Sequence, residues 1–245
     1  MIGAFLETYG LLLAAAIAAG LASGFAGGLF GIGGGIVTVP AVYAMFRAYG
    51  APAEASFKTA IGTSLAVIII TSIRSLGAHR AAGQVDLSLL KSWTPWIAVG
   101  AALGGASAKW VPGEALTLVF ASGALFVAWR RLSGRPKKPE RPVRDLATAR
   151  VRIPLGFGAG LFSSLMGLGG GAVGVMVMTW AGRPIHQAVG TASGFGVAVA
   201  VPGALGFVLS GLAHPEGLPP GSLGYVNLPA FAAVAAAAAL TAPLG

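Results

Sequence analysis

The chain contains no cysteine among its 245 residues, which excludes disulfides, thiolate metal sites and cysteine nucleophiles. Charged residues are scarce too, at 9% of the sequence, whereas a soluble domain has about a quarter. Hydrophobic residues make up 56%, and the mean hydropathy is +0.81. So few charges could not cover a water-soluble surface. The composition therefore predicts an all-α, multi-pass membrane protein.

Carboxylates are absent from the middle of every predicted span. All seven lie at span ends or in loops: Glu7, Glu54, Asp86, Glu114, Glu140, Asp145 and Glu216. Proton relays and cation sites in membranes usually use buried Asp or Glu, so this absence disfavours a cation transporter. Three scattered histidines offer neither a nucleophile–base pair nor a metal cluster. We expect no enzyme activity, no cofactor and no metal.

The basic charge is concentrated in one segment. Nine of the sixteen Lys and Arg residues lie between Arg130 and Arg152, which carries +7 of the net +9. The other 222 residues carry only +2, so no basic face for nucleic acid is expected. Because cytoplasmic loops are enriched in Lys and Arg, the polar segment 132–151 is predicted to be a cytoplasmic linker of a protein in the inner (plasma) membrane.

The linker divides the chain into two transmembrane repeats, 1–131 and 152–245. A span needs about 20 apolar residues, and residues 8–46 form a charge-free run too long for one straight helix. Spans are expected at 9–30, 36–47, 56–78, 89–109 and 113–131, and then at 153–167, 171–182, 187–210 and 227–244. The second repeat has one span fewer, so we expect it to lack its last helix.

Short motifs recur in the same order in both repeats. The sequence Gly-Ile-Gly-Gly-Gly at 31–35 returns as Gly-Leu-Gly-Gly-Gly at 167–171, and Lys-Thr-Ala-Ile-Gly-Thr-Ser at 58–64 returns as His-Gln-Ala-Val-Gly-Thr-Ala at 186–192. The loop around 74–91 carries three Lys or Arg residues, whereas its counterpart around 211–226 carries none. Equivalent loops on opposite sides indicate an inverted repeat.

The two glycine runs are the sharpest candidate for a site. Irregular backbone within a membrane is tolerated only in protein-lined or water-filled space. Helices that begin there present free N–H groups and a positive dipole end, which suit an anion. The alternative is close helix packing, which we prefer for the remaining small-residue positions, Gly20, Gly24, Gly28, Gly156 and Gly160.

Hydroxyl and basic side chains complete the candidate site. Hydroxyls can donate hydrogen bonds to an oxyanion, although back-bonding to a helix carbonyl is an equally good explanation for them. Lys58 and His186 occupy the same repeat position. Only 15 uncharged residues separate Lys58 from Arg74, about 22 Å of helix, so one of these two cations must lie at depth, which suggests function, or snorkel to the surface. The expected substrate-binding residues are Gly33, Gly34, Gly35, Thr63, Ser64, Gly169, Gly170, Gly171, Thr191, Ser193, Lys58 and His186.

These motifs, together with Gly-Gln-Val-Asp at 83–86 and Pro40 after the first glycine run, resemble the TauE/SafE family of sulfite and organosulfonate exporters. The resemblance covers both halves. It implies an inner-membrane exporter of small sulfur-containing anions such as sulfite or organosulfonates. Ser64 is matched by Ala192, so the second hydroxyl motif departs from the first.

Together, these features predict a secondary transporter that binds a small anion between the glycine runs and works by rocking of one repeat against the other. The alternatives are a non-transporting membrane scaffold or assembly protein, and an anion channel. The expected partners are the small anionic substrate and the lipid bilayer, without nucleic acid. The exact anion, the coupling ion, the transport direction and the oligomeric state are left open.

Overall fold

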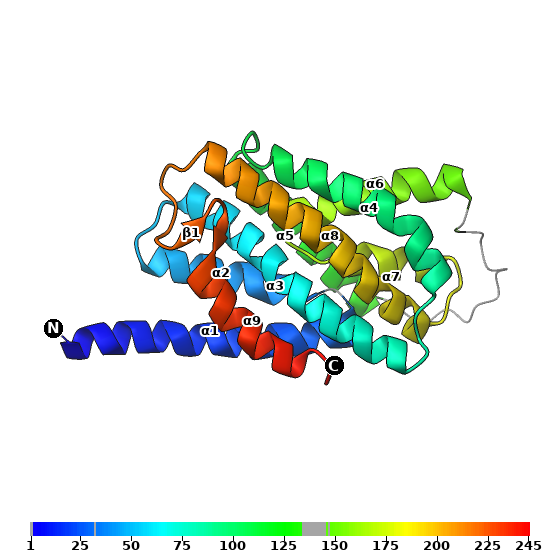
Figure 1. Cartoon of the computed structure of the whole chain (residues 1–245), viewed down its shortest axis with the longest axis horizontal. Helices are drawn as coiled ribbons and strands as arrows, with labels where there is room; N and C mark the ends of the chain where they lie inside the picture. The colour runs from blue at the N-terminus through cyan, green and yellow to red at the C-terminus, as the bar shows by residue number, and fades with distance from the viewer. Residues whose placement is uncertain (1, 32, 134–145, 147) are drawn as a thin grey trace.

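The computed structural model describes residues 2–31, 33–133, 146 and 148–245. Within these ranges the chain is a bundle of helices with one short β-hairpin (Figure 1). The elements are α1 (Ile2–Phe30), α2 (Gly35–Ala48), α3 (Ala53–Ala81), α4 (Leu87–Ser107), α5 (Gly113–Ser133), α6 (Ala149–Leu165), α7 (Gly171–Trp180), α8 (Ile185–Ala213), β1 (Ser222–Leu223), β2 (Val226–Asn227) and α9 (Leu228–Thr241). Most of the predicted linker 132–151 lies outside the described residues.

Helix lengths separate full spans from half spans. Among the described residues, α1, α3 and α8 are long and apolar enough to cross a membrane. By contrast, α2 has 14 residues and α7 has 10. At 1.5 Å per residue these two are about 21 Å and 15 Å long, shorter than a hydrocarbon core of about 30 Å.

Many large apolar side chains point outward, and many alanines are buried in the interior. Leu11 and Leu125 are each 72% exposed, whereas Ala60 and Ala101 are completely buried. Soluble proteins seldom expose so much apolar surface, whereas lipid-facing helices do, and close packing of membrane helices favours small residues. The predicted all-α polytopic membrane fold is confirmed.

The first glycine run reverses the chain instead of breaking one straight helix. The Ser23 hydroxyl of α1 lies 2.7 Å from the Thr38 hydroxyl of α2, so α2 runs back along α1. The reversal is possible because Gly31, Gly33 and Gly34 all have positive φ, which is strained for residues with a side chain. We call residues 31–35 the first glycine turn and residues 167–171, between α6 and α7, the second glycine turn.

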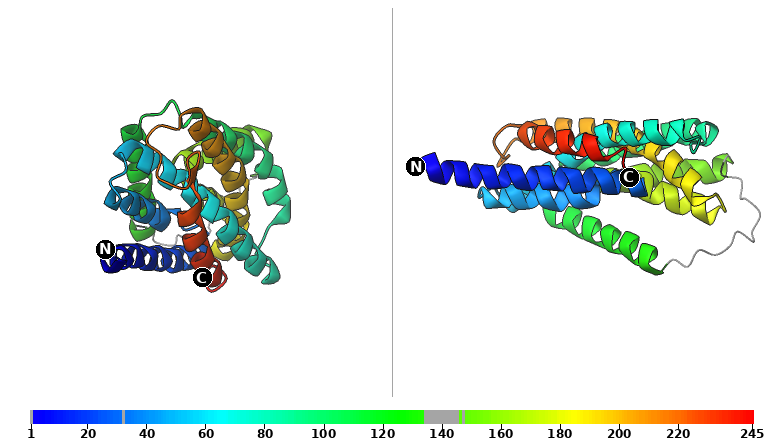
Figure 2. Two further views of the ribbon diagram at one scale, coloured as in Figure 1. Left: turned by 60° about the vertical axis from the view of Figure 1, so that its left-hand side comes forward. Right: turned by 90° about the horizontal axis from the view of Figure 1, so that it is seen from below.

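Helices α3 and α8 cross antiparallel at the centre of the bundle. The Ser75 hydroxyl of α3 lies 3.0 Å from that of Ser193 in α8. Ser72 lies against Gly196, and Leu65 against Gly203, so the contacts run in opposite directions along the two helices. Figure 2 shows the resulting elongated bundle from two further sides. One end carries the β-hairpin; the other carries the end of α5 and the start of α6, and we call it the linker end (Figure 1).

In each half of the chain, one helix packs mainly against helices of the other half. Helix α4 packs on α6 and α8, and α9 packs on α1 and α3. The approach is close because glycine faces backbone: Gly24 lies against the Ala238 carbonyl, and Gly160 against the Ile97 carbonyl. Gly20 also lies against α9 and Gly156 against α4, and Gly28 lies against Ala242 directly after α9, which confirms the packing role predicted for all five glycines.

Candidate substrate site at the glycine turns

The two glycine turns meet inside the bundle. A Cβ built on Gly33 would lie 3.4 Å from the Cα of Gly169, and one on Gly35 would fall on the Gly167 carbonyl. The described residues of both turns, 31, 33–35 and 167–171, are buried. Residues separated by more than 130 positions are therefore in contact, as expected if the two turns form one site.

The short helices start at these turns without a side-chain cap. Gly34 is the N-cap of α2 and Gly170 the N-cap of α7, and neither has a side chain that could accept from the first N–H groups. By contrast, Asp86 caps α4 and Asn227 caps α9 through their side-chain oxygens. The first N–H groups of a helix have no partner within the helix, and the dipole there is positive. Two such ends lie close together at the glycine turns.

Helix α3 fastens both turns through hydroxyls. The Ser64 hydroxyl donates to the Gly167 carbonyl at 2.9 Å, and the Thr71 hydroxyl donates to the Gly33 carbonyl at 3.2 Å. Seven residues apart, Ser64 and Thr71 lie on one face of α3. In this structure the predicted ligand Ser64 therefore positions the second turn. Thr71 was missed by the sequence analysis, although a hydroxyl in an apolar mid-span segment was a usable signal.

The other predicted hydroxyls also have protein partners. Ser193 donates to the Val189 carbonyl one helical turn earlier at 3.1 Å, the back-bonding considered above. Thr63 accepts from the Asn227 N–H and Thr191 from the Asp86 N–H, each at 2.9 Å. No acceptor for the Thr63 or Thr191 hydroxyl proton occurs in the described part of the chain. A direct contact of these four residues with substrate stays a prediction.

Lys58 and His186 do not meet, because they lie near the starts of the antiparallel helices α3 and α8. Lys58 is 5% exposed and forms an ion pair of 2.8 Å with Glu54 one turn earlier. His186 is exposed in the first turn of α8, the helix that begins at the linker end. The buried position of Lys58 is unusual for lysine, and its ammonium keeps donors beyond the one directed at Glu54.

Lys58 faces an open cavity of about 420 Å³ at the hairpin end. Two further basic groups, Lys109 and His214, line it together with the carboxylates of Glu54 and Glu216 and the ring of Tyr225. Burial, helped by the Glu54 carboxylate, raises the pKa of the Tyr225 phenol, so this ring stays neutral. The cavity leads from the surface to the buried ammonium of Lys58. No group of His, Asp or Glu that could hold a metal occurs among the described residues.

The chain is similar to several curated transporters. It is 31% identical to a probable membrane transporter protein of Haemophilus influenzae over 89% of this chain and 81% of that protein. It is 28% identical to one of Methanocaldococcus jannaschii, covering 82% and 73%, and 28% identical to YdhB of Bacillus subtilis, covering 62% and 64%. No solved structure matches. The family model described as sulfite exporter TauE/SafE matches residues 16–245. This chain therefore belongs to the TauE/SafE family and is a membrane transporter.

Proposed function

We propose that this transporter carries small sulfur-containing anions, of the sulfite and organosulfonate class, out of the cell across the inner membrane. The observation that carries the proposal is the meeting of two uncapped helix N-termini, at Gly34 and Gly170. An anion there receives backbone N–H donors and two positive dipole ends without a buried counter-charge. The family's sulfite exporter description supports the substrate class.

We propose further that the two halves form an inverted repeat. Two matched sets of contacts support this relation. Gly31 lies against Val189, and Gly167 lies against Ile61. In the repeated motifs Gly31 corresponds to Gly167 and Ile61 to Val189, so the second contact is the first with the two halves exchanged. The antiparallel crossing of α3 and α8 is the arrangement expected for equivalent helices related by a two-fold axis in the membrane plane.

The linker end is proposed to face the cytoplasm. Arg74, Arg80, Lys91 and Arg183 belong to segments at this end, where α5 finishes and α6 begins. Cytoplasmic loops have this excess of basic residues. The cavity beside Lys58 then opens on the outer side and serves as the outer entrance or exit for the anion.

Transport of radiolabelled sulfite by purified protein in liposomes tests the substrate class. We expect flux above protein-free liposomes, competition by small organosulfonates, and weaker competition by acetate. Substrate-dependent thermal stabilisation across the same anions gives an independent readout. Folded protein with neither flux nor stabilisation for any sulfur anion would rule out the proposal and favour a scaffold. The tight packing of the glycine turns fits that alternative.

The Lys58→Gln variant tests the outer cavity. Glutamine keeps the polar length but removes the charge that attracts an anion, so we expect sulfite flux to fall roughly tenfold, with a smaller loss at high salt. The matched control is Lys91→Gln, since Lys91 is exposed and lies outside the cavity. Equal flux in the two variants would remove Lys58 from the pathway.

A further inference from the structure

Two helix starts, one at each end of the bundle, are held in the same way. At the hairpin end, Asn227 caps α9, and its N–H donates to Thr63 of α3. At the linker end, Asp86 caps α4, and its N–H donates to Thr191 of α8. Thr63 and Thr191 are the paired threonines of the repeated motif, so the two junctions are structural equivalents.

The neighbouring glycines repeat the match. A Cβ built on Gly62 would fall on the Tyr225 carbonyl, and one built on Gly190 would lie 2.6 Å from the Gln84 carbonyl. Tyr225 and Gln84 each precede the capping residue by two positions. In both junctions, therefore, the segment before the helix lies directly on a Gly-Thr step of the central helix pair.

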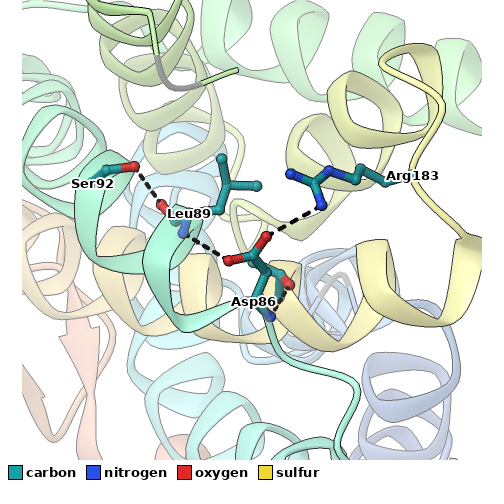
Figure 3. Close-up of polar contacts among 5 residues, drawn as sticks. Asp86, Leu89, Ser92 and Arg183 are labelled. Carbon is teal, nitrogen blue, oxygen red and sulfur yellow. Dashed lines mark hydrogen bonds and ion pairs between the residues drawn. The ribbon is translucent and has the colours of Figure 1, made fainter. Parts of the chain in front are cut away.

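The junctions differ in charge. At the linker end, Arg183 Nη1 lies 3.5 Å from the second carboxylate oxygen of Asp86 (Figure 3). Arg183 belongs to the turn between α7 and α8, so this ion pair joins that turn to the start of α4. At the hairpin end, the cap is the neutral Asn227, and Gly-Ala-Pro at 50–52 stands where the second half has Gly-Arg-Pro at 182–184.

The linker-end ion pair is weak enough to break. Arg183 and Asp86 keep 31% and 18% of their side-chain surface exposed, and solvent weakens such pairs. Arg183 Nε is buried without a hydrogen-bond partner in the described part of the chain, so the guanidinium is only partly satisfied. The Lys58–Glu54 pair at the other end lies within α3 and joins no two elements.

We propose that the Asp86–Arg183 ion pair is a gate that closes the linker end of the transport pathway. In this structure the ion pair is formed, while the cavity beside Lys58 is open at the hairpin end. Among the residues that the structure describes, none forms such a contact at the neutral junction of Asn227, so the charge pair biases the resting protein toward this conformation. This inference rests on the proposed alternating transport, and it identifies the contact that breaks when the linker end opens.

The gate can be measured without substrate because the chain has no cysteine. Nitroxide labels on Ser88→Cys and Ile185→Cys, both exposed positions beside the gate, report its opening as a longer distance in a double electron–electron resonance experiment. The gate variants are Asp86→Asn, which keeps an N-capping oxygen, and Arg183→Ala. Each is expected to raise the ratio of long to short distances by up to about fivefold.

The double variant and a charge control make the result decisive. Asp86→Asn with Arg183→Ala should shift the ratio no further than either change alone, because both remove one contact. Arg74→Ala, which removes an exposed basic residue at the same end, should leave the distances unchanged.

Distances in Asp86→Asn that match the parent protein, or an equal shift in Arg74→Ala, would overturn the gate. If Arg183→Ala does not fold, Asp86→Asn alone decides the question, because its cap is retained. A distance shift in a protein that moves no sulfur anion would support the gate and refute the proposed substrate. Sulfite transport with unchanged distances would support the proposed substrate and refute the gate.

Discussion

Replacing Gly35 with alanine should separate the two glycine turns and strongly destabilise the protein. The new methyl group would fall on the Gly167 carbonyl, which is backbone and also accepts the Ser64 hydrogen bond. No side chain can rotate away to make room. Overpacking of this kind costs about 1–3 kcal/mol and occasionally more, and we expect the upper end of that range. The measurement is thermal unfolding in detergent, followed by tryptophan fluorescence.

Gly77→Ala is the matched control for this change. A Cβ built on Gly77 in α3 has nothing within 4 Å, and alanine favours a helix over glycine by up to about 1 kcal/mol. This variant should be as stable as the parent protein or more so. If Gly35→Ala unfolds at the same temperature as Gly77→Ala, the two turns are not held in the close contact described here.

Larger substitutions in the glycine turns would not test substrate binding directly. Leucine at Gly34 or Gly170 would disturb the packing first, because both positions lack room for a Cβ.

The second large effect is expected for Thr63→Val. Valine keeps the shape of threonine but removes the acceptor for the N–H of Asn227, a residue that is 3% exposed. A buried donor left without a partner costs about 1–3 kcal/mol. Thr191→Val should cost less, because the Asp86 N–H that it strands is only partly buried. Comparison of the two unfolding temperatures checks this order.

Thr59→Val provides the control on the same helix. Thr59 is completely buried, and its hydroxyl has no hydrogen-bond partner in the described part of the chain. Its replacement by valine should therefore be neutral or stabilising. Thr63→Ser should keep most of the stability that Thr63→Val loses, since serine retains the hydroxyl acceptor. A Thr59→Val variant as unstable as Thr63→Val would show that the effect comes from the methyl group and not from the hydrogen bond.

Much of the fold followed from local sequence. Apart from α1, which begins at Ile2 and not at residue 9, the predicted spans match the helices to within four residues, because apolar runs and their polar or glycine boundaries are local properties. The five packing glycines were identified for the same reason, since small residues at four-residue spacing form one face of a helix. The sequence also predicted a special role for both glycine runs, because an irregular backbone inside a membrane requires an explanation.

The direction of the chain at the first glycine turn was not predictable. The sequence showed two segments joined at glycines, and either a straight broken helix or a reversal satisfies that pattern. The choice depends on what the turn contacts. Ser23 and Thr38 hold α2 back against α1, and Thr71 fixes the turn from α3. Hydroxyl partners of this kind are distant in sequence and leave no periodic signal.

The sequence by itself determined the membrane class, the helix positions, the repeated motifs and the family, because hydropathy, glycine spacing and motif order are written along the chain. Only the tertiary structure decided that α4 and α9 are exchanged between halves, that Lys58 and His186 lie at opposite ends, and that Asp86 contacts Arg183. The physical reason is that these features depend on which helix faces pack together. Many Gly- and Ala-rich faces could pack almost equally well, and the arrangement that forms depends on the contacts summed over the whole bundle.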